Sequence, residues 1–235
     1  MLKVSIIASM YNESEYAPVF FKEMAWARKQ LDKKLGKTEI VIVDNGSTDQ
    51  TPKLCDKLGK KYKVRIVHAP KPSEGKGNGI SLGIKASRGE ILVLLDSDGQ
   101  QDPRDVVRIA EKLDDLKPEG YGGVIGWRFR KVGYTKTRNF LSFWWNLLNK
   151  TLFGIDIHDF GAQPRAFLRK AVEGYEIKSK RWLIEVELPF EAKKRGFNIT
   201  DEPVSHRVRG GGVSKIRLDN VPQIFFDLLA LRFSK

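Results

Sequence analysis

The 235-residue sequence predicts an α/β fold in which a mostly parallel sheet is covered by helices on both faces. Its first half alternates short runs rich in β-branched residues with longer segments that have the residue spacing of helices. These runs are apolar almost throughout, rather than at every second position, which is typical of strands buried on both faces. Because 41% of the residues are hydrophobic, we expect one substantial core.

The first two strand–helix units follow this pattern. Val4–Ser9 is a β-branched run that predicts a strand, and a helical pattern follows it to about Leu35. Glu39–Asp44 predicts the second strand, and Asp49–Tyr62 the second helix. An Asn-Gly pair between them permits a tight turn, and a serine or an aspartate can cap the helix that follows.

The same alternation continues to the middle of the chain. The expected elements are, in order, Val64–Ala69, Gly77–Ala86, Glu90–Asp96, Pro103–Leu116 and Gly122–Arg128. The first, third and fifth are apolar runs that predict strands, and the other two have helical spacing.

Two further helices are expected in the second half. Lys136–Ile155 is apolar on more than one face, and Arg138, Ser142 and Asn146 form a polar stripe because they recur at every fourth residue. Such a helix is either deeply buried or partly at a membrane interface. Leu218–Phe233 predicts an amphipathic helix that packs on the domain or lies on a membrane.

Composition narrows the class of partner. The formal net charge of +13 indicates a polyanion, whether nucleic acid, an anionic membrane surface or a phosphorylated substrate, unless the charge only solvates one face. No motif for nucleic-acid recognition is present, so nucleic acid is not an expected partner. The single cysteine, Cys55, excludes an internal disulfide and suits a reducing compartment. No apolar run approaches the roughly 20 residues of a membrane span.

Polar clusters follow three of the expected strands. They are Tyr11-Asn12-Glu13, Asp44-Asn45-Gly46-Ser47 and Asp96-Ser97-Asp98. The carboxyl ends of parallel strands meet at one edge of a sheet, and ligands bind there. We therefore expect these clusters to converge on a ligand site.

The third cluster has the chemistry of a cation site. Asp96 and Asp98 share one side of an extended backbone, and Gln100 adds an amide oxygen two residues later. Oxygen ligands of this kind suit Mg²⁺ or Mn²⁺. A turn that caps the next helix is an equally good explanation of the doublet alone, although Asp102 before Pro103 already provides such a cap.

Two residues are candidates for binding a nucleotide. Asp44 ends an apolar strand, where it can accept hydrogen bonds from a base or a ribose. Lys76 lies in a glycine-rich loop that lacks the spacing of a nucleoside-triphosphatase loop. The loop either brings Lys76 and the backbone to a phosphate or is a plain connector.

The order of these motifs resembles a known family. MYNESE, DNGSTDQT, EGKGNGIS and LDSDGQQDP, followed by GWR, Arg138-x-x-x-Ser142 and PVSHRVRGGGVSK, are similar to glycosyltransferase family 2. Within it they most resemble dolichyl-phosphate mannose synthases and related polyprenyl-phosphate glycosyltransferases. The resemblance implies a GT-A domain at 1–217, with a nucleotide-sugar-binding half at 1–116 and an acceptor-binding half at 117–217. A C-terminal amphipathic helix then occupies 218–235.

The resemblance also implies roles for particular residues. Those expected at the nucleotide sugar are Ser9, Tyr11, Glu13, Asp44, Lys76, Asp96 and Ser97. Those expected at the acceptor phosphate are Arg128, Arg138, Ser142, Arg209 and Lys215. The expected metal ligands are Asp96, Asp98 and Gln100, and the expected catalytic residues are Asp98, Arg128 and Arg209. Asp159 and Glu187 match further family positions, although Glu187 fits a structural salt bridge equally well.

The implied reaction is the inverting transfer of a hexose, mannose from GDP-mannose in the first instance, to dolichyl or polyprenyl phosphate. UDP-linked sugars are the other expected donors, and Mg²⁺ or Mn²⁺ is the expected cofactor. We expect a cytoplasmic protein bound peripherally to the cytoplasmic face of a membrane, with or without a separate anchoring subunit. The alternatives are a soluble glycosyltransferase with a small phosphorylated acceptor and a non-enzymatic protein that binds nucleic acid or a membrane surface.

Overall fold

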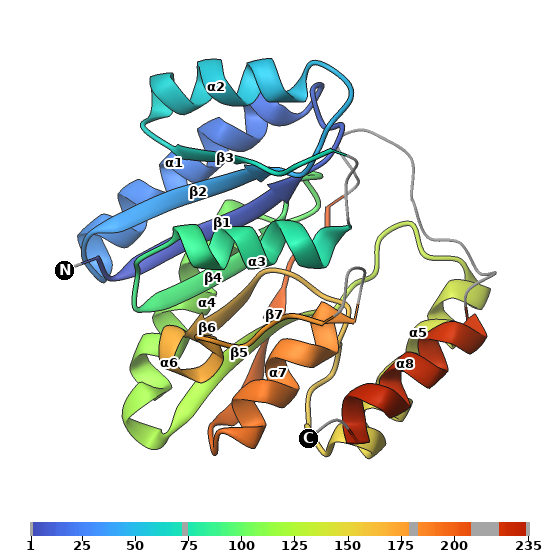
Figure 1. Cartoon of the computed structure of the whole chain (residues 1–235). Helices are drawn as coiled ribbons and strands as arrows, with labels where there is room; N and C mark the ends of the chain where they lie inside the picture. The colour runs from blue at the N-terminus through green and yellow to red at the C-terminus, as the bar shows by residue number, and fades with distance from the viewer. Residues whose placement is uncertain (1, 72–74, 179–182, 208–220, 234–235) are drawn as a thin grey trace.

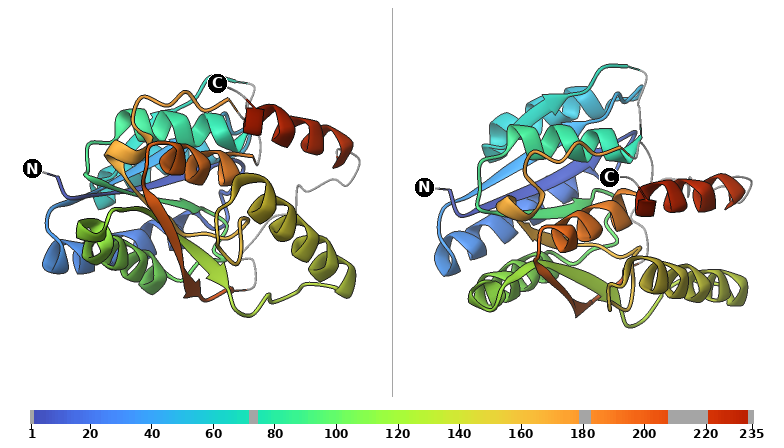
Figure 2. Two further views of the ribbon diagram at one scale, coloured as in Figure 1. Left: turned by 90° about the horizontal axis from the view of Figure 1, so that it is seen from below. Right: turned by 60° about the horizontal axis from the view of Figure 1, so that its bottom comes forward.

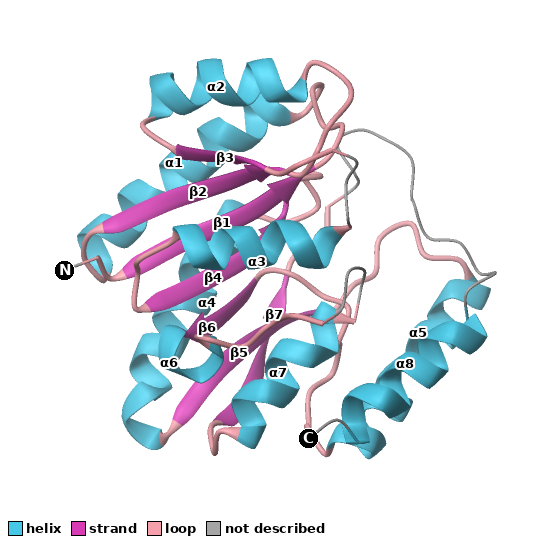
Figure 3. Cartoon of the chain, viewed as in Figure 1, coloured by secondary structure: helices cyan, strands magenta, loops and turns pink. Residues whose placement is uncertain are grey.

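The computed structural model describes residues 2–71, 75–178, 183–207 and 221–233. Within them one sheet has seven strands in the order β3-β2-β1-β4-β6-β5-β7 (Figures 1 and 3). The strands are β1 Val4–Met10, β2 Thr38–Asp44, β3 Arg65–His68, β4 Ile91–Asp96, β5 Tyr121–Arg128, β6 Arg165–Leu168 and β7 Asn198–Val204. Only β6 runs against its neighbours β4 and β5, and the other pairs are parallel.

Helices cover both faces of this sheet. The helices of the described residues are α1 Ala17–Lys34, α2 Thr51–Tyr62, α3 Lys76–Ala86, α4 Pro103–Leu116, the 3₁₀ turn η1 Lys117–Glu119, α5 Lys136–Phe153, α6 Arg169–Val172, α7 Ile184–Lys194 and α8 Val221–Phe233, of which α5 and α8 do not cover the sheet. In Figure 1, α3 and α7 lie in front of the sheet, and α1 and α4 lie behind it. The core is formed where these layers meet β1, β2 and β4, which are buried along nearly their whole length.

The α/β class and the five expected strands are confirmed, with boundaries within one residue of those expected. Asp102 caps α4 as expected, because its side chain accepts a hydrogen bond from the backbone N–H of Arg104. The sequence did not predict β6, α6, α7 or β7. The β6 strand has only four residues, and β7 is a polar strand at the sheet edge that contains Pro203, so neither has the pattern of a typical strand.

Helices α5 and α8 project away from the sheet (Figures 1 and 2). On α5 only Asn149 and Phe153 are buried, so the deeply buried alternative is wrong for most of this helix. Its exposed apolar side chains are Phe140, Leu141, Phe143, Trp144 and Leu147. On α8, Leu228 and Leu231 are buried while Phe226 and Phe233 are exposed, so apolar side chains lie on more than one face of this helix and not on a single face as expected. No helix in the described part of the chain is long and apolar enough to cross a membrane.

Candidate active site

The three polar clusters meet at one edge of the sheet, as expected. The parallel register places Met10 opposite Asp44 and Ser9 opposite Asp96, so β1, β2 and β4 end together. The side chains that follow these strands consequently share one rim.

Hydrogen bonds fasten the loops of this rim to one another. Asn12, in the left-handed region with a φ of 54°, donates its backbone N–H to Ser47 Oγ at 3.1 Å. Its side-chain oxygen accepts the backbone N–H of Thr48 at 2.8 Å. Ser97 Oγ donates to the backbone oxygen of Ser9 at 3.0 Å, which joins the ends of β4 and β1. The expected residues Ser9 and Ser97 therefore shape the rim through this contact.

Residues of the first two clusters are well ordered by local contacts. The backbone N–H of Glu13 donates to Thr51 Oγ1 at 2.9 Å, and the side chain of Glu13 is largely buried. Asp44 is 2% exposed, and its Oδ1 accepts the backbone N–H of Ser47 at 3.1 Å. Tyr11 is half-buried directly after β1. All three lie at or just beyond the carboxyl ends of β1 and β2.

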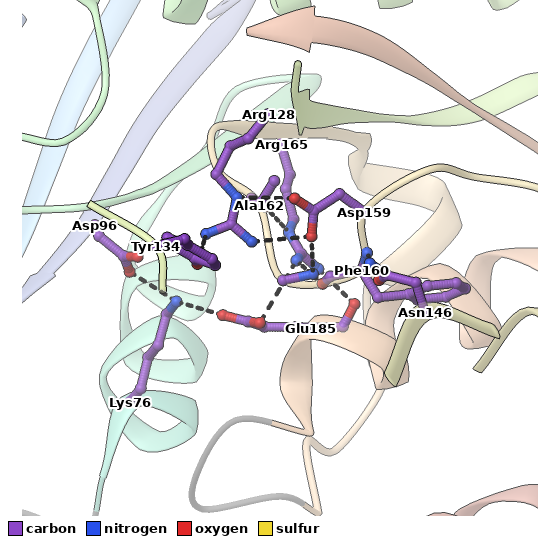
Figure 4. A network of polar contacts seen from close by, with 11 residues as sticks. Lys76, Asp96, Arg128, Tyr134, Asn146, Asp159, Phe160, Ala162, Arg165 and Glu185 are labelled. Atoms are coloured by element: carbon purple, nitrogen blue, oxygen red, sulfur yellow. Dashed lines mark hydrogen bonds and ion pairs between the residues drawn. The ribbon is translucent and has the colours of Figure 1, made fainter. Parts of the chain in front are cut away.

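Lys76, at the start of α3, points into the rim between two carboxylates (Figure 4). Its Nζ lies 2.7 Å from Asp96 Oδ1 and 2.9 Å from Glu185 Oε1. Burial opposes the charge of Lys76, but Asp96 and Glu185 raise its pKa above the ordinary value. A Cβ at Gly79 would clash with the Ser9 side chain, so the glycine lets α3 approach β1 closely. Lys76 is therefore a fixed cation at the rim.

The loop after β4 offers oxygen ligands. Asp98 Oδ1 accepts the backbone N–H of Gln100 at 3.1 Å, which brings these two side chains onto one turn. The amide nitrogen of Gln100 faces His206 Nε2 at 3.2 Å, so the nitrogen rather than the amide oxygen makes this contact. Burial, and then the charges of Arg128 and Arg138, lower the pKa of His206, which favours its neutral ring.

This donor set fits a hard divalent cation. The described residues contain no group of three or more His, Cys, Asp or Glu side chains that would hold a metal by themselves. A carboxylate and an amide oxygen suit Mg²⁺ or Mn²⁺, which commonly take their remaining ligands from water and substrate phosphates. Asp96 is engaged by Lys76, so it would contribute beside an ammonium group.

Arg128 is the last residue of β5 and lies on the other side of the rim, where its guanidinium contacts Asp159 and Tyr134 (Figure 4). Its Nε and Nη2 donate to the two carboxylate oxygens of Asp159 at 2.8 and 2.9 Å. Its Nη1 donates to the hydroxyl of Tyr134 at 2.7 Å. Burial opposes the charge of Asp159, but the Arg128 guanidinium holds the pKa of that carboxyl below its usual range. Arg128 is thus fixed in direction.

Three positively charged side chains lie close to the ring of Tyr134. The guanidinium of Arg138 lies 3.8 Å from the ring centre, that of Arg128 5.4 Å, and Lys131 Nζ 5.8 Å. Lys131 also donates to Ser142 Oγ at 2.6 Å. Burial lowers the pKa of Lys131, and the charge of Arg128 lowers it further. Such a cluster is stabilised by an anion, and a phosphate matches its donors.

The polar stripe of α5 faces this cluster. Arg138 stacks on Tyr134, Ser142 accepts from Lys131, and Asn146 Oδ1 accepts the backbone N–H of Phe160 at 2.8 Å. Five apolar side chains on the rest of this helix surface are exposed: Phe140, Leu141, Phe143, Trp144 and Leu147.

Three expected residues have other outcomes. Glu187 is buried, and its Oε1 accepts the hydroxyl of Tyr175 and the backbone N–H of Lys178, both at 2.7 Å. These contacts hold residues 175–178 against α7, and the salt bridge considered from the sequence stays a prediction. Arg209 and Lys215 lie outside the described residues.

The sequence did not single out Tyr134, Glu185, Arg165 or His206. Glu185 lies 109 residues from Lys76 in the chain, so no local pattern connects them. Arg165 is fully buried, donates to the backbone oxygens of Ala162, Phe160 and Glu185, and supports Glu185 from behind (Figure 4). The one feature of the sequence that could have pointed to Arg165 is a charged residue beside the apolar residues of β6.

Comparison with known proteins gives a family and several relatives. The chain matches the model of glycosyl transferase family 2 over residues 5–175. It is 29% identical to polyprenol monophosphomannose synthase of Mycolicibacterium smegmatis, over 94% of this chain and 83% of that protein. It is 36% identical to human dolichyl-phosphate beta-glucosyltransferase over 49% of this chain and 37% of that protein. Dolichol-phosphate mannosyltransferase of Pyrococcus furiosus is 27% identical over 92% of this chain, which spans 60% of that protein.

Solved structures agree on the fold. A mannosyltransferase from Pyrobaculum calidifontis, in complex with GDP-Man and Mn²⁺, has a TM-score of 0.65 at 19% identity and covers 98% of this chain and 63% of its own. Glucosyl-3-phosphoglycerate synthase from Mycobacterium tuberculosis, in complex with Mg²⁺ and UDP, has a TM-score of 0.66 at 18% identity and covers 98% of this chain and 79% of its own. The expected GT-A fold is confirmed.

Proposed function

Since this chain is a glycosyltransferase that belongs to family 2, we propose that it transfers a hexose from a nucleotide diphosphate sugar to a polyprenyl phosphate. Three relatives named for polyprenyl or dolichyl phosphates support this acceptor class. Two of these relatives are named for mannose, so GDP-mannose is the first donor to test, and UDP-glucose is the second.

The main support for a polyprenyl phosphate acceptor is the arrangement of side chains around Tyr134. Arg128, Lys131 and Arg138 form a cation cluster beside α5. The same helix exposes Phe140, of which 62% is accessible, and its aromatic neighbours. A phosphate with a long apolar tail matches both surfaces at once, because its charged and apolar ends are joined. We propose that α5 lies against a membrane surface, where this acceptor resides.

The donor side follows from the rim. Asp44 would receive the base or the ribose, and Lys76 would face the diphosphate. Asp98 and Gln100, with Asp96, would hold Mg²⁺ or Mn²⁺, which when bound neutralises charge on the departing diphosphate. Glu185 lies between the donor and acceptor sides, where its carboxylate can accept hydrogen bonds from hydroxyl groups of the hexose.

The chemistry needs orientation more than proton transfer. A phosphate acceptor is already anionic at neutral pH, so no general base has to remove a proton. Arg128 and Arg138 would hold its oxygen in line with the anomeric carbon. As the new carbon–oxygen bond forms, the bond to the diphosphate breaks and its electron pair leaves with the nucleoside diphosphate. A single direct displacement inverts the anomeric centre.

Transfer of radiolabelled sugar tests the proposal. The protein is incubated with GDP-mannose or UDP-glucose, Mg²⁺ or Mn²⁺, and a short polyprenyl phosphate presented in detergent micelles. We expect metal-dependent label in the lipid phase. Label on phosphoglycerate, offered in a parallel reaction, with none on the lipid would instead establish a small soluble acceptor. No product from either acceptor would contradict the proposed reaction.

A further inference from the structure

The end of β3 carries a contact that the proposed reaction has not used. His68, the last residue of β3, lies between two carboxylates. Its Nδ1 is 3.0 Å from Asp44 Oδ2, and its Nε2 is 3.0 Å from Asp56 Oδ1. An ionised carboxylate only accepts hydrogen bonds, so each ring nitrogen must donate, and only the imidazolium has a proton on both. These two contacts therefore require the protonated, positively charged form of the His68 ring.

The two carboxylates differ in their surroundings. Asp44 is 2% exposed at the end of β2, on the rim where the donor nucleotide is proposed to bind. Asp56 lies on α2, and its side chain is 60% exposed. His68 thus joins an inner carboxylate that belongs to the site to an outer one that faces solvent.

The other titratable group at this place does not compete for the proton. Cys55, on α2, is buried, and burial followed by the charges of Asp44, Asp56 and Asp49 raises the pKa of its thiol to about 12. Its thiol remains neutral at ordinary pH. The described charged groups that act on the His68 ring are accordingly Asp44 and Asp56.

We propose that His68 is a positioning residue for the donor nucleotide: its protonated ring holds the Asp44 carboxylate in place for the base or ribose, and Asp56 extends this hold to higher pH. The inference rests on the proposed donor site. It identifies a residue that acts through Asp44 without touching the reacting atoms.

The sign of the pH dependence follows from the contacts. The hydrogen bond to Asp44, and then that to Asp56, raise the pKa of His68 above its ordinary 6.5. Below that raised pKa both bonds are present. Above it, one ring nitrogen becomes an acceptor facing a carboxylate, so one bond is replaced by repulsion. Nucleotide affinity should therefore fall as the pH rises through the pKa of His68.

Calorimetry of GDP and UDP binding, with Mg²⁺ and from about pH 6 to about pH 9, measures this affinity across the relevant range. The main variant is Asp56→Asn, which lies outside the proposed catalytic groups. It should move the fall in affinity to lower pH and leave the low-pH affinity unchanged. His68→Gln should bind roughly tenfold more weakly than the wild type at low pH, because it keeps the size but loses the charge-assisted bond. At each pH, the ratio of the wild-type affinity to that of His68→Gln cancels the effect of the titration of the nucleotide's own phosphates.

A second readout follows the ring directly. The sequence has only three histidines, so ¹⁵N side-chain spectra assign His68 by its loss in His68→Gln. The proposal is overturned if His68 titrates at its ordinary pKa. It is also overturned if Asp56→Asn shifts the titration of His68 but leaves the affinity profile unmoved. Normal nucleotide binding without sugar transfer would contradict the proposed reaction alone, because these measurements do not depend on turnover.

Discussion

Replacing Asp159 by asparagine tests the buried pair that fixes Arg128. The side chains of Arg128 and Asp159 are only 14% and 3% exposed, and two hydrogen bonds join them. Removing one partner of a buried pair typically costs about 3–5 kcal/mol, because the remaining charge is left uncompensated. Asparagine keeps the shape and one acceptor oxygen, so we expect the lower end, about 3 kcal/mol. For a chain of this length that lowers the unfolding midpoint by roughly 6–12 °C.

Thermal and urea unfolding measure the loss. The control is Asp156→Asn, the same substitution in the exposed pair of Asp156 with Lys150, where no shift of the midpoint is expected. Added pyrophosphate should stabilise Asp159→Asn more than the wild type, because an anion can take the place of the missing carboxylate. If Asp159→Asn unfolds with the midpoint of the control, the pair does not hold Arg128, and the proposed role of Arg128 at the acceptor phosphate is wrong.

Three further perturbations separate the parts of the site. Lys76→Met should raise the KM for the nucleotide sugar roughly tenfold or more, and unchanged donor kinetics would remove Lys76 from the diphosphate site. Asp98→Asn, or removal of divalent metal with EDTA, should reduce transfer by at least about a hundredfold, with full recovery by Mg²⁺ or Mn²⁺ only in the wild type; activity that survives chelation would exclude a metal. Trp144→Ser should weaken sedimentation with anionic vesicles while nucleotide binding stays intact, and equal sedimentation would show that α5 does not touch the membrane.

The convergence of the polar clusters at one edge of the sheet could be predicted from the sequence, because strand direction alone determines it. Once β1, β2 and β4 are recognised as parallel, the residues after them must meet at one edge, whatever the details of packing. The positions of Asp44, Asp96 and Asp98 follow from this rule. Asp102 was equally predictable, because a helix cap depends on only a few neighbouring residues.

The acceptor side could not be predicted in the same way, because it depends on contacts between distant segments. β6 inserts antiparallel between β4 and β5, and its four residues carry no period from which a strand could be recognised. Glu185 reaches Lys76 from a helix that the sequence did not predict. Tyr134 contacts two guanidinium groups only because Arg128, at the end of β5, and Arg138, near the start of α5, meet at its ring in the folded chain.

If the proposed acceptor binds beside α5, the arrangement of this helix would let a strongly basic protein select one kind of anion. Residues at every fourth position share one face of a helix, so Arg138 and Ser142 turn toward the cations around Tyr134. Phe143 and Trp144 are rotated away from that stripe and are exposed. A phosphate bound at the stripe would therefore carry its tail directly onto the apolar flank, across the width of a single helix. A nucleic-acid backbone would satisfy the cations but leave that flank in water, so the apolar flank, rather than the net charge, favours a lipid phosphate.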